Sequence, residues 1–249
     1  MSLLTRRALV GGLAAGLAGC DRLGRDPRFR ALLEQGEAGN YALHRLLQDR
    51  TALAQEFAPS QRSPIFRANG TRMPAGADYA RHLAGGFADW RLVVDGAVAR
   101  PQAFGLDQLK AMPARSQITR HDCVEGWSAI AKWTGVPLKL LLDRVGVRPE
   151  ARFVVFHCAD PQGNGAPYYE SVDRVDAAHP QTILAWALND QLLPVQNGAP
   201  LRLRVERQLG YKHAKYVQRV EAVTSLAGVY GGKGGTWEDG AGYEWYAGI

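Results

Sequence analysis

The chain has 249 residues, of which 46% are hydrophobic, and its formal net charge is +6 at pH 7. This length allows one large domain or two small ones with a sizeable core. The 28 glycines and 13 prolines indicate many turns and short strands and argue against a helix bundle. The positive charge alone allows an anionic ligand, a membrane surface or nucleic acid as a partner.

The first 20 residues predict an export leader. Arg6 and Arg7 precede an apolar run, residues 8–18, that is too short to span a bilayer as a helix. This pattern resembles a twin-arginine signal, with an ordinary secretory leader as the alternative. Residues 17–20 resemble a lipobox that would make Cys20 a lipidated first residue, or a chance cysteine near a cleavage site. We therefore expect a periplasmic protein that a lipid on Cys20 could tether to the membrane, and no nucleic-acid partner.

The next segment combines a tether and a helix. Residues 21–36 are polar and arginine-rich, whereas from about residue 37 to 57 apolar side chains recur on one helical face. This periodicity predicts a helix that docks on the main domain and ends before Pro59. The expected boundaries are 1–20 for the leader, 21–62 for the tether and docking helix, and 63–249 for the main domain with a C-terminal wrap.

The main domain is expected to be an α+β domain dominated by strands. Residues 63–70 predict a strand and a turn at Asn69-Gly70, and Asn189-Asp190 predicts a hairpin. Residues 201–206 alternate leucine or valine with charged residues, which predicts a half-buried strand with a charged face. Other strands are expected at 90–94, 117–123, 152–158, 183–188, 191–194 and 215–223, short helices at 105–110 and 138–142, a loop at 163–165, and an ordered, aromatic-rich tail at 231–249.

Two cysteines remain once Cys20 is assigned to the leader. Cys123 lies between Asp122 and Glu125, and these carboxylates should raise the pKa of the thiol unless a cation or a metal offsets them. Cys123 is therefore an inert small residue, half of a disulfide with Cys158, or a thiolate held by a metal. No C-x-x-C or H-x-x-H spacing occurs, so a zinc site made only of side chains is not expected.

Residues 196–215 combine a turn, a basic strand and a second basic turn. Arg202 and Lys215 could converge on an anion such as a phosphorylated cofactor, and Gly210 would let backbone amides approach it. A solvated basic strand face is the alternative. The chain has no G-x-G-x-x-G after a strand, no P-loop and no G-x-S-x-G, which argues against the nucleotide cofactors and the serine nucleophile of those motifs.

These two regions together resemble the sulfite oxidase-type molybdopterin enzymes, and among them the periplasmic methionine-sulfoxide reductase catalytic subunits. The matching motifs are CVEGWS at 123–128, WTGVPL at 133–138, HPQT at 179–182, NGAPLR at 197–202 and GYKHAK at 210–215. They occur in the family's order, and the resemblance covers roughly residues 63–223. It implies a mixed-sheet sulfite-oxidase-type fold and an enzyme that uses a molybdenum–molybdopterin cofactor.

The resemblance also implies roles for single residues. Cys123 would be the thiolate ligand of molybdenum, which suits a soft ligand. Tyr168 would lie near the oxo or substrate position of the metal, and is otherwise a core or rim tyrosine. Cys158 replaces a pterin-contacting threonine, so a backbone contact could remain while the hydroxyl bond is lost. The other pterin-binding positions are Asn69 (otherwise only a turn residue), Arg72, Asn197, Arg202, His213, Ala214 and Lys215.

The residues after the cysteine bear on the substrate. Sulfite oxidases have a small, arginine-rich segment there, whereas Glu125 and Trp127 bring an acid and a large ring, so sulfite and nitrate fit poorly. We expect reduction of a sulfoxide or another small organic oxide; the alternatives are oxidation of a sulfur compound and a non-catalytic lipoprotein binding module. No C-x-x-C-H haem motif occurs, so electrons should be exchanged with a haem-containing membrane subunit or a cytochrome. The short C-terminal part leaves no room for a dimerisation domain, and a monomer is expected.

Overall fold

The computed structural model describes residues 24–161 and 165–249. The predicted leader, its lipobox and most of the expected loop at 163–165 lie outside the described residues. Contacts divide the chain into two compact units, Met1–Asp49 and Arg50–Ile249. Within the described ranges, no helix is both long enough and apolar enough to cross a membrane.

The first unit contains one long helix, α2 (Pro27–Leu47). It begins about ten residues earlier than the periodicity predicts, because the Asp26 side chain caps it by accepting from the backbone amide of Arg28 at 2.7 Å. The expected continuation to residue 57 is wrong. Residues 53–55 are non-helical, and Glu56 forms a β-bridge with Thr119 in the second unit.

The second unit is rich in strands and has short helices, which confirms the α+β expectation. Its strands are β1 (Arg91–Gly96), β2 (Gln102–Gly105), β3 (Arg115–Cys123), β4 (Trp127–Pro137), β5 (Phe153–Pro161), β6 (Pro167–Asp173), β7 (Ile183–Leu188), β8 (Gln191–Leu192), β9 (Arg202–Arg204) and β10 (Val217–Val223). Its helices are α3 (Ala77–Ala84), α4 (Leu106–Lys110), α5 (Leu138–Val145), α6 (Arg174–Ala177) and α7 (Thr236–Ala241), with single 3-10 turns at η1 (Pro59–Gln61), η2 (Val195–Asn197) and η3 (Gly210–Lys212).

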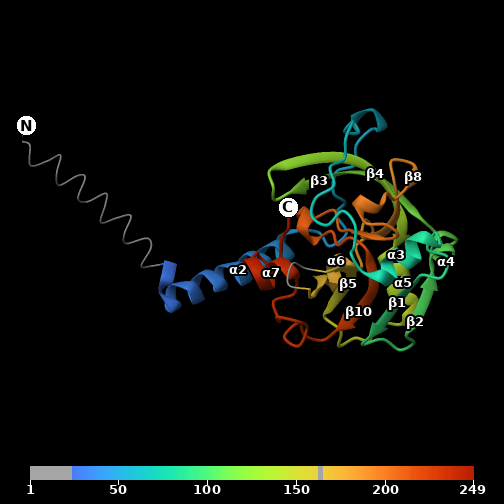
Figure 1. Cartoon of the computed structure of the whole chain (residues 1–249). Helices are drawn as coiled ribbons and strands as arrows, with labels where there is room; N and C mark the ends of the chain where they lie inside the picture. The colour runs from blue at the N-terminus through green and yellow to red at the C-terminus, as the bar shows by residue number, and fades with distance from the viewer. Residues whose placement is uncertain (1–23, 162–164) are drawn as a thin grey trace, which may run out of the picture. The chain divides into compact units, whose positions relative to one another are not determined.

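The strands form two sheets of five strands each, and Figure 1 shows how they are arranged. One sheet has the order β2-β1-β10-β5-β6 and is mixed, since β1 and β10 run parallel and the other pairs are antiparallel. The other has the order β3-β4-β7-β8, with β9 also pairing with β7. In this second sheet β3 and β4 form a long hairpin, drawn in green, whose last pair is Cys123 with Trp127. The hairpin turn therefore holds the candidate cysteine in a defined position.

The largest core cluster packs against the first sheet. Alternating side chains of β1, including Leu92 and Val94, are fully buried, and so are Val154 and Phe156 of β5. Helix α5 adds four buried side chains (Leu138, Leu141, Leu142 and Val145). Burial of each such side chain contributes roughly 1.5–3 kcal/mol, so this cluster accounts for much of the stability of the second unit.

Two expectations for strands are wrong. Residues 63–70 form no strand, since Pro64 cannot donate to a sheet, and the chain turns away at Gly70 with φ 60°. In β9 the expected solvated charged face is absent, because Arg202 and Arg204 are 1% and 0% exposed. Apolar and charged side chains do alternate along this strand, but protein covers both of its faces.

The C-terminal tail is hydrogen-bonded to the core at both of its ends. The backbone amide of Tyr169 in β6 donates to the Thr236 hydroxyl at 3.0 Å. Near the terminus, the amide of Leu209 donates to the carbonyl of Ala247 at 2.9 Å. The aromatic residues of the tail are not all buried: Trp237 remains 42% exposed.

Candidate functional site

A cavity of about 510 Å³ lies at the turn of the β3–β4 hairpin, which is a volume typical of sites for small ligands and cofactors. Segments that are distant in the sequence line it together: residues 69–71, 123–125, 160–161 and 168, with Arg202, four residues between 210 and 215, and five between 236 and 243. Six of the residues proposed from the sequence are in the lining, namely Asn69, Cys123, Tyr168, Arg202, His213 and Lys215. The fold thus gathers the two candidate regions into one site.

Four other proposed residues do not line the cavity. Asn197 is buried beside it, where its carbonyl accepts a hydrogen bond from Arg202 Nη1 at 3.3 Å. Ala214 and Cys158 belong to the hydrophobic core cluster, which leaves the Cys158 thiol without access to a ligand. Arg72 is exposed. Sequence position alone cannot show which side of a loop or strand reaches the cavity.

Cys123 is buried at the end of β3, with the amide of Asn69 donating to its sulfur at 3.8 Å. Both Cys123 and Cys158 are free thiols, so the disulfide alternative is wrong. Burial raises the pKa of Cys123, and the charge of Glu125 adds to this effect, while the Glu125 amide, Asn69 and Arg202 act in the opposite direction. The thiol is therefore protonated at neutral pH unless a bound metal deprotonates it.

Two buried cations face the same cavity. Arg202 makes no salt bridge with any described residue, and its Nε atom has no hydrogen-bond partner there. Burial and the neighbouring Arg204 lower the pKa of Arg202 to about 9. Burial and the charge of Arg202 lower the pKa of Lys215 to about 8. Because each depressed pKa reflects unfavourable burial of positive charge, the site favours a bound anion.

Lys215 is held by backbone rather than by a carboxylate. Its Nζ atom donates to the carbonyl of Asn69 at 2.6 Å, to the carbonyl of Gln196 at 3.1 Å, and also to that of Thr71. These contacts join the early 69–71 loop to the basic 196–215 region. They place the ammonium group between two segments that the sequence separates by more than a hundred residues.

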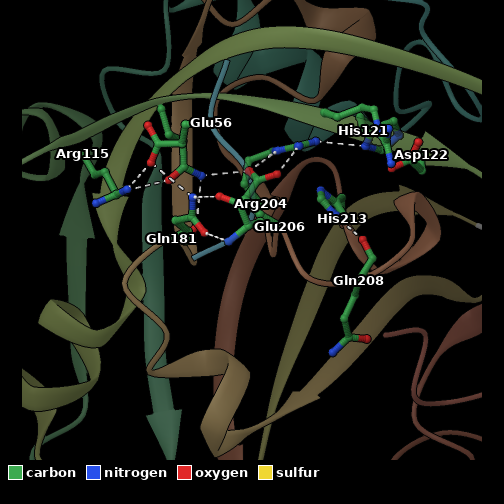
Figure 2. Close-up of polar contacts among 12 residues, drawn as sticks. Glu56, Arg115, His121, Asp122, Gln181, Arg204, Glu206, Gln208 and His213 are labelled. Atoms are coloured by element: carbon green, nitrogen blue, oxygen red, sulfur yellow. Dashed lines mark hydrogen bonds and ion pairs between the residues drawn. The ribbon is translucent and has the colours of Figure 1, made fainter. Parts of the chain in front are cut away.

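Behind the cavity, a buried polar network holds β3 against β9 (Figure 2). Arg204 donates to Glu206 at 2.9 and 2.6 Å and to His121 Nδ1 at 3.0 Å. Gln117 donates to Glu206 at 2.8 Å and to the carbonyl of Gln181 at 3.0 Å. Because Gln117 and His121 of β3 are linked to the distant residues Gln181, Arg204 and Glu206, the network fixes the strand that carries Cys123.

Two neutral histidines lie between this network and the cavity. Burial, with the charge of Arg204 next, holds the pKa of His121 and of His213 well below the usual range. His213 Nε2 donates to the carbonyl of Gln208 at 3.0 Å, which leaves Nδ1 as an acceptor without a partner among the described residues. At Gly210 a Cβ atom would lie 2.5 Å from His121 Nε2, so only glycine fits against this ring.

The comparisons with known proteins agree with this geometry. Residues 82–228 match the family model of the oxidoreductase molybdopterin-binding domain. The chain belongs to this family. It is therefore a molybdopterin oxidoreductase, and the expected enzyme class and sulfite-oxidase-type fold are confirmed.

Similar proteins extend the comparison beyond the molybdopterin-binding domain. The chain is 37% identical over 253 residues to the putative protein-methionine-sulfoxide reductase subunit YedZ1 of Azospira oryzae, covering 99% of this chain and 87% of that protein. It is 40% identical over 147 residues to the protein-methionine-sulfoxide reductase catalytic subunit MsrP of Xanthomonas campestris pv. campestris, covering 55% of this chain and 46% of that protein. The chain thus spans less than half the length of this second relative.

A solved structure supports the fold. The sulfane dehydrogenase SoxCD from Paracoccus pantotrophus superposes with a TM-score of 0.51 at 24% identity, covering 55% of this chain and 39% of that chain. This likeness shows a shared fold over about half of this chain.

The residues of the cavity fit the molybdopterin cofactor that the family implies. A soft thiol is present for the metal, and two cations without carboxylate ion pairs among the described residues are present for a phosphate. Polar atoms that lack partners among the described residues surround them: Asn69 Oδ1, Asn197 Nδ2, Arg202 Nε and His213 Nδ1. Buried polar atoms are normally hydrogen-bonded, so these atoms indicate a polar ligand.

Several lining residues were not identified from the sequence. Asp160 at the end of β5 and Tyr211, Trp237 and Tyr243 all lie in the lining. The aromatic-rich composition of the tail was the only available signal for the last two. Nothing in the local sequence distinguishes Asp160 from other carboxylates near strand ends.

Asp160 should make the stability of the cofactor-free domain depend on pH. Burial raises the pKa of Asp160 to about 6, whereas an unfolded aspartate ionises near pH 3.9, roughly. Between these values the folded state binds more protons, so its stability should fall as pH rises, by on the order of 3 kcal/mol for this group. The change in the free energy of unfolding from pH 4.5 to pH 7.0, measured with urea, should lie further toward lower stability in the unsubstituted protein than in Asp160→Asn. An equal difference in both proteins would contradict this assignment.

Proposed function

We propose that this molybdopterin oxidoreductase is exported and reduces a sulfoxide or another small organic oxide. The observation that carries the proposal is the cavity that joins the Cys123 thiol to the buried cations Arg202 and Lys215. Molybdenum on molybdopterin supplies two-electron oxygen-atom transfer when it is bound. The relatives named as methionine-sulfoxide reductase subunits support reduction of a sulfoxide.

In this proposal a thiol binds the molybdenum, and the two cations that line the cavity bind the pterin. Cys123 holds the metal, and Arg202 and Lys215 bind the phosphate of the pterin through charge-assisted hydrogen bonds. Asn69 and His213 offer polar atoms to the edges of the pterin. Asn197 is buried beside the cavity and stays in the proposal through its Nδ2 atom, which has no partner among the described residues. We do not extend the proposal to the side chains of Arg72, Cys158 and Ala214, which lie outside the lining.

Tyr168 is proposed to orient the oxygen of the substrate. Its side chain lines the cavity, and its hydroxyl donates to the carbonyl of Tyr211 at 3.3 Å. Burial raises the pKa of Tyr168 well above the usual range, and the charge of Glu170 adds to this. The phenol therefore stays protonated at physiological pH, and its single hydrogen would turn from the Tyr211 carbonyl to the oxygen of a neutral S=O group.

The lining next to Cys123 favours a neutral substrate over an oxyanion. Glu125 lines the cavity, and its carboxylate accepts a hydrogen bond from Trp127 Nε1 at 2.9 Å. A fixed negative charge this close to the thiol repels sulfite and leaves a neutral oxide unaffected. Reduction of such an oxide consumes two electrons and two protons and releases water.

The electrons are proposed to come from a separate redox protein, either a haem-containing membrane subunit or a soluble cytochrome. The designation of the relatives as subunits supports a partner of this kind. The periplasm, with a tether through Cys20, is the proposed location.

The proposal predicts both a cofactor and a substrate preference. Protein made in a host competent for molybdenum cofactor should contain about one molybdenum and one pterin per chain, the ratio expected for one metal-binding thiol. It should oxidise a reduced viologen dye in the presence of sulfoxides, and it should oxidise sulfite at least about tenfold more slowly, since Glu125 repels the anion. Metal analysis, pterin fluorescence and the two rate assays check this. Absence of molybdenum, or sulfite as the better substrate, would contradict the proposal.

A further inference from the structure

The C-terminal segment supplies one wall of the cavity. Helix α7 and the residues after it contribute Thr236, Trp237, Gly240, Ala241 and Tyr243 to the lining. All of them lie beyond residue 228, where the family match ends. This chain therefore completes its site with residues from outside the molybdopterin-binding domain.

This wall presents aromatic rings in an ordered arrangement. Trp237 and Tyr243 stack with ring centroids 5.7 Å apart and planes at 24°. Tyr243 also meets Tyr211 edge to face, with centroids 5.1 Å apart. Despite these contacts, Trp237 and Tyr243 keep 42% and 36% of their surface exposed. Ring faces exposed within a cavity favour apolar and polarisable groups of a ligand.

Buried polar contacts hold the wall in place. Lys212, which is fully buried, pairs with Glu170 of β6 at 2.7 Å and with Glu238 of α7. Beyond the helix, the Tyr211 hydroxyl donates to the carbonyl of Glu244 at 2.6 Å. Since the residue that follows each of the two rings is anchored, Glu238 after Trp237 and Glu244 after Tyr243, binding requires little further ordering of the wall.

We propose that Trp237 and Tyr243 are specificity-determining residues that bind the apolar substituent next to the oxide group of the substrate. The inference rests on the proposed function and deepens it. Two ring faces without charge select oxides that carry an aryl or extended alkyl substituent. Small oxides, such as dimethyl sulfoxide, reach the thiol end of the cavity without contacting both rings, and gain little from them.

A pair of sulfoxides tests this proposal. In the loaded enzyme, Trp237→Ala and Tyr243→Ala should each lower kcat/KM for methyl p-tolyl sulfoxide by at least about tenfold, mainly through KM, because each removes a stacking face. The value for dimethyl sulfoxide should change by less than about twofold. Trp237→Phe, which keeps a ring, should restore most of the preference for the aryl substrate.

Tyr230→Ala is the matched control. Tyr230 belongs to the same C-terminal region and is 50% exposed, but it does not line the cavity. The Tyr230→Ala substitution should leave kcat/KM unchanged for both sulfoxides. An equal loss for both substrates in Trp237→Ala would show a structural effect, and no loss for either would leave the wall without a role in specificity; both results overturn the proposal.

A binding measurement separates this inference from the proposed reaction. Methyl p-tolyl sulfone carries the same aryl group and is not a substrate for oxygen removal. Its affinity for the loaded enzyme, measured by ligand-observed NMR, should fall at least about tenfold in Trp237→Ala. If the unsubstituted enzyme reduces no sulfoxide but the sulfone binds with this dependence, only the proposed function fails. If the sulfone binds Trp237→Ala as tightly as the unsubstituted enzyme, the proposed role of the aromatic wall in binding the substituent is wrong.

Discussion

Replacement of Cys123 by serine is expected to lower the rate of oxide reduction by at least about 100-fold, the upper range seen when groups that support a metal are lost. The cysteine is the thiol that lines the cavity, and Asn69 donates to its sulfur. A serine hydroxyl is a harder ligand and is far less readily ionised. The viologen-coupled assay measures the loss of activity. The pterin content of the purified variant shows whether the cofactor is still bound in the cavity.

The control for this substitution lies on the same strand. Ser116 is exposed on β3, and its hydroxyl contacts Thr134 at 2.7 Å, away from the cavity. Ser116→Ala should retain full activity. If Cys123→Ser also retains full activity, Cys123 is not the metal ligand, and the proposed chemistry fails with it.

Replacement of Arg202 by methionine is expected to abolish retention of the pterin while the cofactor-free domain becomes no less stable. Arg202 is buried and forms no salt bridge with the described residues, so removal of its charge removes a desolvation cost. We expect a gain of about 1–4 kcal/mol in the free energy of unfolding of the cofactor-free protein. Urea unfolding and the pterin content of the purified protein measure the two effects separately.

Arg204 provides a contrast on the same strand. It is equally buried, but it forms a two-point ion pair with Glu206 and donates to His121. Arg204→Met leaves Glu206 buried without its partner, and should destabilise the protein by about 3–5 kcal/mol. If Arg202→Met destabilises the domain as much as Arg204→Met, or leaves pterin content unchanged, Arg202 has a structural role and does not bind the anion.

Local patterns were sufficient where neighbours in the chain determine the conformation. The turn at Asn189-Asp190, with both residues at positive φ, was predicted from short-range preferences. The strand that carries Cys123 was expected at residues 117–123, and β3 does end at Cys123. The motif around it, taken with the basic region at 196–215, was enough to identify the family, because the order of several short motifs carries more information than any one of them.

Predictions from sequence patterns were wrong where burial or conformation depends on segments that pack against the residue from elsewhere in the chain. The alternation in β9 predicted a charged face, but only packing shows that Arg202 is buried beside a cavity and Arg204 beside Glu206. Similarly, the periodicity near residue 50 indicated a helix, whereas contact with β3 draws the chain into an extended conformation. Pairing with a distant strand outweighs a weak local preference.

The amino-acid sequence therefore specified the family and its molybdopterin cofactor, since these depend on residue types in a fixed order, and it led to the proposal of Cys123 as the metal ligand. It could not specify which side chains reach the cavity. That required the sheets to bring residue 69, the hairpin turn and residue 215 together, and the buried Lys212–Glu238 pair to hold the C-terminal wall beside them. Convergence of this kind results from contacts between residues far apart in the chain, and local sequence does not encode the distances between them.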